Sequence, residues 1–279
     1  MNVVKKSEYD LDTLRHSAAH LLAQAVLELF PGTKTGIGPA VENGFYYDFL
    51  RDEPFTPEDL NEIEKKMKEI SERDIPIKKI CASKDEAKDR FENLKQALKV
   101  ELIEEKGDKE VTAYEQGGFV DFCLGPHVPS TGEIKHFKIL SSSGAYWKGD
   151  EQSHRLQRIY GTVFFTKKEL DDYLDLLEEA KKRDHRKLGT ELDLFSFNEK
   201  LGGGLILWHP KGAVIRSVIE DYWKEEHFKD GYDLLYSPHV AKLDIWRISG
   251  HTEFYDALYP PFEREGIEYQ LKPMNCPFH

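Results

Sequence analysis

The sequence has few cysteines, no long apolar run and no excess of basic residues. Its three cysteines, Cys81, Cys123 and Cys276, are far apart and odd in number. This pattern excludes a disulfide framework and indicates a reducing compartment, so we expect a cytoplasmic protein. No apolar stretch approaches the ~18 residues of a membrane span, and no membrane partner is expected. The net charge of −12 argues against broad binding of nucleic acid, but it does not exclude a local basic RNA-binding face.

The residues that are present supply material for two folded domains. The chain has 279 residues, of which 39% are hydrophobic and 12% aromatic, and a domain usually has ~100–200 residues. Apolar residues at helical spacing predict a first helix over residues 13–30, with Asp12 as its N-cap. Further helices are expected to begin at Thr56, which precedes a proline, and at Ser83, which starts a capping box.

A long polar helix separates two regions of different composition. Thr166 and Glu169 form a capping box at its start, and the helix is expected to run to Lys187. Its apolar stripe is narrow, which is typical of a helix that links two domains. Beyond it the pattern predicts an amphipathic helix over residues 213–228 and a strand over residues 232–236. Two domains joined by a helical linker are therefore expected.

The first helix carries two histidines, His16 and His20, in the string HSAAH. Four residues make about one helical turn, so both imidazoles project from the same face. The later string DFCLGPH places Cys123 and His127 at the same spacing, through a Gly-Pro that excludes a helix. A single histidine pair is usually structural or solvated, but a second pair in the same domain favours a site. These residues would suit zinc, and they are equally able to position water and move protons.

Two protease classes that use such residues fit the sequence poorly. A zinc protease helix needs a glutamate directly after its first histidine, and this position is Ser17. A cysteine protease would use Cys123 as its nucleophile, but nothing in the local sequence favours this, and four convergent residues are more than it needs. The residues alone leave the choice between a metal site and metal-free catalysis open.

A set of strings, in order along almost the whole chain, resembles a known family. Five strings are similar to the editing domain of bacterial threonyl-tRNA synthetases: HSAAH, IGPAVENGFYYDF, YEQGGFVDFCLGPHVP, GAYWKGD and LQRIYGT. Four later strings resemble the start of their catalytic domain: RDHRKLGTELDLF, LWHPKGAVIR, YSPHVAKLDIWRISGH and LKPMNCPFH. The resemblance implies an α+β fold with antiparallel sheets. It assigns residues 1–165 to the editing domain, residues 166–187 to a linker helix, and residues 188–279 to the first part of a class II catalytic domain.

The resemblance implies a pocket that hydrolyses seryl-tRNA made by mistake. The matching catalytic positions are His16, His20, Lys99, Asp121, Cys123 and His127, and Tyr47 matches a substrate-binding position. In this pocket His16 and Lys99 would orient or activate water, Asp121 would hold the α-amino group, and the Cys123–His127 pair would shape the hydroxyl pocket. Such a second site is needed because one methyl group discriminates only ~10–200-fold. The family's pocket is described as metal-free, whereas the related alanyl-tRNA synthetase domain holds zinc, so we expect no zinc here.

The resemblance also implies a larger parent enzyme that attaches threonine to its tRNA with ATP and Mg²⁺. Cys276 matches one ligand of a catalytic zinc that recognises threonine, although Phe278 stands where the family has glycine. The helix over residues 213–228 and the strand over residues 232–236 match the interface of a homodimer. The other zinc ligands, the ATP motifs and the anticodon-binding domain would lie beyond His279. We therefore expect a fragment that cannot activate threonine by itself.

Two other functions remain as alternatives. A free-standing trans-editing deacylase would also be unable to aminoacylate, but it has no need of the catalytic-domain sequence from Arg183 onward. A non-catalytic synthetase paralogue could act as a binding module, but it has no need of a complete pocket. The basic run over residues 181–187 either contacts RNA phosphates or is the solvated end of a helix.

Overall fold

Antiparallel strands with helices packed beside them make up both parts of the chain. The computed structural model describes residues 9–106, 109–150, 153–255 and 258–279. These residues divide into unit 1, which ends at Lys182, and unit 2, which begins at Arg183. Within these ranges every strand pair is antiparallel, which confirms the predicted α+β class. No helix among the described residues is long and apolar enough to cross a bilayer.

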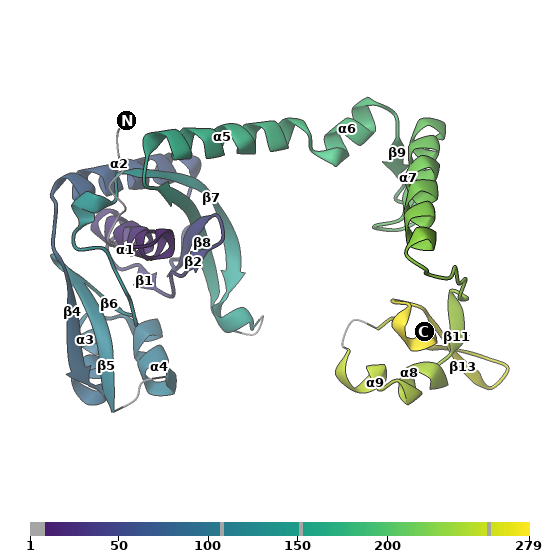
Figure 1. Ribbon diagram of the computed structural model, residues 1–279. Coiled ribbons are helices and arrows are strands. Elements are labelled where there is room, and N and C mark those ends of the chain that lie inside the picture. The colour runs from purple at the N-terminus through teal and green to yellow at the C-terminus, as the bar shows by residue number, and fades with distance from the viewer. Residues whose placement is uncertain (1–8, 107–108, 151–152, 256–257) are drawn as a thin grey trace. The chain divides into compact units, whose positions relative to one another are not determined.

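The larger sheet of unit 1 forms the floor of its core. Its order is β1 (Lys34–Thr35), β3 (Gly44–Leu50), β8 (Arg155–Phe164) and β7 (His136–Tyr146), with β2 (Ala40–Val41) paired to β3. Helix α1 (Leu11–Leu29) packs against β3 and β8, and α2 (Pro57–Glu72) packs against α1 and β7 (Figure 1). Alternate residues of a strand face the same side. Phe45, Tyr47 and Phe49 accordingly enter the core beneath α1, fully buried.

Helix α1 begins two residues earlier than predicted. Asp10, rather than Asp12, is the N-cap, because its side chain accepts a hydrogen bond from the Thr13 backbone N–H at 2.8 Å. Asp12 instead lies in the first turn, where an acidic side chain is favourable near the positive end of the helix dipole. The register of the apolar face is unchanged, so His16 and His20 stay on one side of the helix as expected.

Unit 1 also contains a smaller sheet with two helices beside it. Its order is β4 (Ile77–Ser83), β5 (Glu110–Gln116) and β6 (Phe119–Phe122). Helix α3 (Lys84–Asn93) packs on β4 and β5, and α4 (Ala97–Lys106) packs against α3 and β1. Short 3₁₀ turns η1 (Thr131–Glu133) and η2 (Trp147–Gly149) flank β7. The predicted helix starts at Thr56 and Ser83 are confirmed, since both residues form capping boxes.

The polar helix predicted to run to Lys187 is two helices. The first, α5 (Lys167–Lys182), starts at the predicted capping box, in which the Thr166 N–H donates to the Glu169 carboxylate. The second, α6 (His185–Glu191), has its own N-cap, because the Asp184 carboxylate accepts from the Arg186 N–H at 2.8 Å. An N-cap has non-helical backbone angles. Asp184 therefore interrupts a run that looks continuous in the sequence.

Unit 2 contains two small sheets and one long helix. Strands β9 (Phe195–Phe197) and β10 (Ile206–Trp208) form a hairpin-like pair, followed by α7 (Pro210–Lys229). The second sheet has the order β11 (Val240–Lys242), β13 (Ile267–Leu271) and β12 (Phe262–Arg264). Besides α6, the described residues of unit 2 form two short helices, α8 (Asp244–Ile248) and α9 (His251–Phe254), and the 3₁₀ turn η3 (Cys276–Phe278).

The prediction of a strand over residues 232–236 is wrong, because this segment pairs with no other strand among the described residues. A strand needs a neighbour to satisfy its backbone N–H and C=O groups. The segment instead exposes large side chains, with Leu235 and Tyr236 at 62% and 81% exposure. The apolar side of α7 is likewise exposed, as Val218 and Ile219 illustrate.

Candidate functional site

Helix α1 contributes two histidines to the site from adjacent turns of one face. Their ring centroids are 5.3 Å apart, as the four-residue spacing predicts. His20 is 2% exposed, whereas His16 is only partly buried. The intervening residues Ser17, Ala18 and Ala19 are small and fully buried. Their size lets α1 lie close to its neighbours, and this holds both imidazoles beneath the surface.

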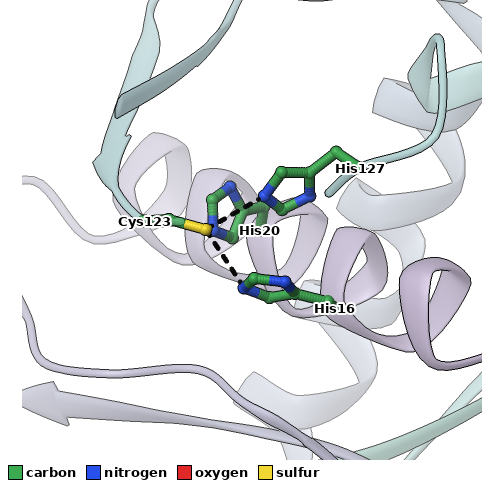
Figure 2. A group of neighbouring side chains, drawn as sticks. All are labelled: His16, His20, Cys123 and His127. Atoms are coloured by element: carbon green, nitrogen blue, oxygen red, sulfur yellow. Dashed lines mark hydrogen bonds between the residues drawn. The ribbon is translucent and has the colours of Figure 1, made fainter. Parts of the chain in front are cut away.

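The loop that follows β6 brings the second pair to the first (Figure 2). The Cys123 Sγ lies 3.3 Å from His16 Nε2 and 3.2 Å from His127 Nε2. The loop turns at Gly125, which has a φ of +69°. A Cβ there would lie 2.2 Å from the Tyr114 hydroxyl oxygen, so only glycine fits. The two motifs, a hundred residues apart in the sequence, thus form one cluster.

A buried ion pair lies next to the histidine and cysteine cluster. Lys99 from α4 and Asp121 from β6 are paired, with side chains 2% and 3% exposed. The Tyr47 hydroxyl from β3 donates a hydrogen bond to Asp121 Oδ2, and His20 Nε2 lies 3.3 Å from that same oxygen. All seven residues singled out from the sequence of unit 1 therefore converge. Their individual roles in catalysis stay predictions.

Burial shifts the pKa values of the imidazoles, the thiol and the tyrosine hydroxyl of the cluster, and in each case it favours the uncharged form. It lowers the pKa values of His16, His20 and His127, for His20 and His127 well below the ordinary histidine range. It raises the pKa of the Cys123 thiol to about 12 and that of the Tyr47 hydroxyl well above its usual range. At neutral pH the site therefore holds uncharged imidazoles and a protonated thiol beside one buried ion pair.

The cluster opens into a cavity of about 270 Å³. Besides His16, His20, Lys99, Asp121 and Cys123, its walls include Ile37, Gly38, Pro39, Phe122 and Leu124. A second cavity of about 320 Å³ shares His16 and Pro39 with the first. Gly38 permits the arrangement, since a Cβ there would lie 2.1 Å from the Tyr47 ring. These apolar wall residues were not predicted, although all five lie in two of the quoted strings, IGPAVENGFYYDF and YEQGGFVDFCLGPHVP.

Four residues of the cluster could hold a metal ion. One donor atom from each of His16, His20, Cys123 and His127 lies within 4.8 Å of the others. The His20 Nδ1 is buried and has no hydrogen-bond partner among the described residues. Three imidazoles and a thiol are ligands that zinc accepts. The cluster therefore fits such an ion, and a bound metal would displace the thiol proton.

Cys276, the residue matched to a catalytic zinc ligand, lies in unit 2. Its Sγ is 3.3 Å from His251 Nε2, a contact that the sequence did not predict. A catalytic zinc usually has three protein ligands, and no third donor joins this pair among the described residues. The described part of unit 2 does not fit a zinc ion at Cys276.

The sequence of the chain is similar to those of known threonine–tRNA ligases. Residues 111–160 match the family described as threonyl and alanyl tRNA synthetase second additional domain. A threonine–tRNA ligase of Dehalococcoides mccartyi is 53% identical over 271 residues, which are 97% of this chain and 46% of that protein. The threonine–tRNA ligase of Nitrosococcus oceani is 51% identical over 282 residues, covering 100% of this chain and 44% of that protein. The chain is homologous to the threonine–tRNA ligases.

The homology covers nearly the whole chain, but the chain spans less than half the length of these threonine–tRNA ligases. Within it, the matched residues 111–160 include Asp121, Cys123 and His127, whereas the histidines of α1 lie outside that range. A solved structure of the RNA binding domain of threonyl-tRNA synthetase from Cryptosporidium parvum Iowa II is 36% identical. It covers 35% of this chain and 24% of that one, with a TM-score of 0.33, which is too low to compare folds.

Proposed function

We propose that unit 1 is the editing site of a threonine–tRNA ligase and hydrolyses seryl-tRNA made by mistake. The observation that carries the proposal is the convergence of neutral imidazoles, a thiol and a buried lysine–aspartate pair on one cavity. The homology to threonine–tRNA ligases supports the choice of substrate. Among the described residues of the site there is one thiol, that of Cys123, and it keeps its proton, so these residues offer no exposed strong nucleophile. Attack by water on the ester is therefore the favoured reaction.

The residues can perform the steps of ester hydrolysis without a metal ion. A neutral His16 can accept a proton from the attacking water. The Lys99 ammonium can stabilise the oxyanion that develops on the carbonyl oxygen, in a site where little water screens the charge. Asp121 Oδ2 already faces Tyr47 and His20, whereas Oδ1 faces only Lys99. A carboxylate oxygen can accept two hydrogen bonds, so Oδ1 can also receive the α-amino group of the seryl ester.

Selection of serine over threonine would come from the size of the cavity. The walls beside Cys123 are made of Ile37, Pro39 and Phe122, and Tyr47 beneath them is fully buried. Forcing one extra methyl group into a packed site costs ~1–3 kcal/mol. This corresponds to about 5- to 150-fold in rate, since 1.4 kcal/mol is about tenfold. In a double-sieve mechanism the second site hydrolyses only the products that are small enough to enter it.

The whole enzyme would attach threonine to its tRNA with ATP and Mg²⁺ in the cytoplasm. In this proposal residues 1–165 are the editing domain, residues 166–187 are the linker, and residues 188–279 begin the catalytic domain. The first eight residues of the editing domain lie outside the described residues. The exposed apolar side of α7 would form part of a homodimer interface. Cys276 would bind zinc only with ligands from elsewhere in the enzyme. The basic residues near Lys182 are a candidate contact for tRNA phosphates.

The proposal is tested by ester hydrolysis. The purified chain is given seryl-tRNA and threonyl-tRNA specific for threonine, and release of each amino acid is followed. We expect rapid loss of the seryl ester alone, and at least a hundredfold slower loss for His16→Ala. His136→Ala, which removes a histidine of β7 outside the cluster, is the matched control and should hydrolyse at the wild-type rate. Hydrolysis of both esters at equal rates, or none with tRNA bound, would contradict the proposal and leave a binding module.

A further inference from the structure

Ser17, the residue after the first histidine, has a set of hydrogen bonds that fixes where protons sit in the cluster. Its side chain is fully buried on α1. Its Oγ lies 2.8 Å from the Thr13 carbonyl oxygen, 2.9 Å from the Val128 backbone nitrogen and 3.1 Å from His127 Nδ1. A serine hydroxyl has one proton to donate and two lone pairs that accept. Three partners therefore use the whole capacity of the group.

Two of the three partners have only one possible role. The Thr13 carbonyl can only accept, so it takes the hydroxyl proton. The Val128 N–H can only donate, so it uses one lone pair. The second lone pair faces His127 Nδ1, which must then carry a proton. A neutral imidazole has a single N–H, so the Nε2 of His127 is left with a lone pair.

The same assignment of protons and lone pairs extends to the Cys123 thiol and to His16. The Cys123 Sγ accepts from the Gly125 N–H at 3.1 Å and lies between His127 Nε2 and His16 Nε2. Because His127 Nε2 has a lone pair, the single thiol proton is donated to it. His16 Nε2 must then donate its N–H to the sulfur, and this leaves the His16 lone pair on Nδ1. His16 is also the histidine that lines both cavities.

We propose that Ser17 is a positioning residue for ester hydrolysis: it fixes the tautomer of His127 and, through Cys123, that of His16. This inference rests on the proposed function for its effect on rate, but the tautomers themselves do not. If Ser17 were replaced by alanine, His127 could carry its proton on either nitrogen. In the reversed state His127 Nε2–H donates to the sulfur, the thiol donates to His16 Nε2, and His16 Nδ1 holds a proton. That His16 cannot accept a proton from water at Nδ1.

The tautomers are read directly by NMR. The full chain, labelled with ¹⁵N-histidine, is examined at pH 7 by long-range ¹H–¹⁵N correlation, and the two rings are assigned with His16→Asn and His127→Asn. We expect a protonated Nδ1 on His127 and a protonated Nε2 on His16. In Ser17→Ala we expect the Nδ1–H signature of His127 to be lost or averaged. A wild-type His127 that carries its proton on Nε2 would overturn the proposal, whether or not the chain hydrolyses any ester.

A second measurement separates positioning from folding. Ser71→Ala is a matched control, since Ser71 is also a buried helical serine and donates to the Ile134 carbonyl oxygen at 2.7 Å, outside the cluster. With seryl-tRNA we expect kcat to fall at least tenfold in Ser17→Ala with KM unchanged, and kcat to stay within twofold in Ser71→Ala. Equal effects of the two changes on kcat would refute a special role for Ser17. If the wild-type chain hydrolyses no ester, the proposed function fails, and the NMR result still decides the tautomers.

Discussion

Acidification should destabilise unit 1 through its three buried imidazoles. Burial lowers the pKa values of His16, His20 and His127 in the folded chain, whereas an unfolded histidine has a pKa of about 6.5. Below that value the unfolded chain binds protons that the folded chain does not bind. The stability is therefore full above pH 6.5 and is lost progressively as the pH falls below it. Between pH 7.0 and pH 5.5 a histidine that stays neutral in the folded chain contributes a loss of about 1.2 kcal/mol, so His20 and His127 together contribute about 2.5 kcal/mol, and His16 adds up to about 1.2 kcal/mol.

The loss is measurable because a whole domain is stabilised by only ~5–15 kcal/mol. Pulse proteolysis in urea at each pH gives the free energy of unfolding of unit 1, if the fragment that ends near Lys182 is followed. His127→Gln should reduce the pH dependence by about 1.2 kcal/mol, whereas Ile70→Val, a fully buried core change, should lower the stability by ~0.5–1.5 kcal/mol equally at every pH. A wild-type stability that is constant from pH 7.0 to pH 5.5 would refute the buried, neutral cluster.

Three further changes test the ion pair, the cavity wall and the absence of a resident metal. Asp121→Asn leaves the buried Lys99 charge without its partner, so the free energy of unfolding in urea should fall by about 3–5 kcal/mol; a loss below ~1 kcal/mol would mean that the pair is solvated. Gly38→Ala displaces the Tyr47 ring and should lower kcat/KM for seryl-tRNA at least tenfold, whereas Gly118→Ala, which meets no neighbouring atom, should not. Dialysis against a chelator should leave ester hydrolysis unchanged, and metal analysis of the purified chain should show no stoichiometric zinc in the pocket; loss of activity restored by added zinc would favour a metal centre.

Local signals in the sequence predicted the local structure well. The capping boxes at Ser83 and Thr166 each depend on two residues three positions apart, so they form with little dependence on the rest of the fold. The first helix was placed correctly apart from its N-cap, which shifted from Asp12 to Asp10. Residue spacing also placed His16 and His20 on one face. These features depend on helix geometry, which a sequence encodes over a single turn.

Features that depend on distant partners could not be predicted in the same way. The strand expected over residues 232–236 has suitable side chains, but a strand forms only where another strand supplies its hydrogen bonds. Asp184 can either sit within a helix or cap a new one, and the sequence does not decide between them. The convergence of α1 with Cys123 and Lys99 came from the family resemblance, because no spacing rule links residues so far apart. The contact between Cys276 and His251 had no sequence signal at all.

The protonation of the cluster limits what its residues can contribute to catalysis. Burial that keeps His16 neutral also makes it a weak base, and a weaker base gives a smaller gain from proton transfer. The rate must therefore depend more on position: on the Lys99 charge, which is strong in a dry site, and on which His16 nitrogen holds the lone pair. A fully buried serine with three fixed hydrogen bonds is well suited to set that choice. The small residues of α1 and the tight turn at Gly125 are thus as important to the chemistry as the groups that would touch the substrate.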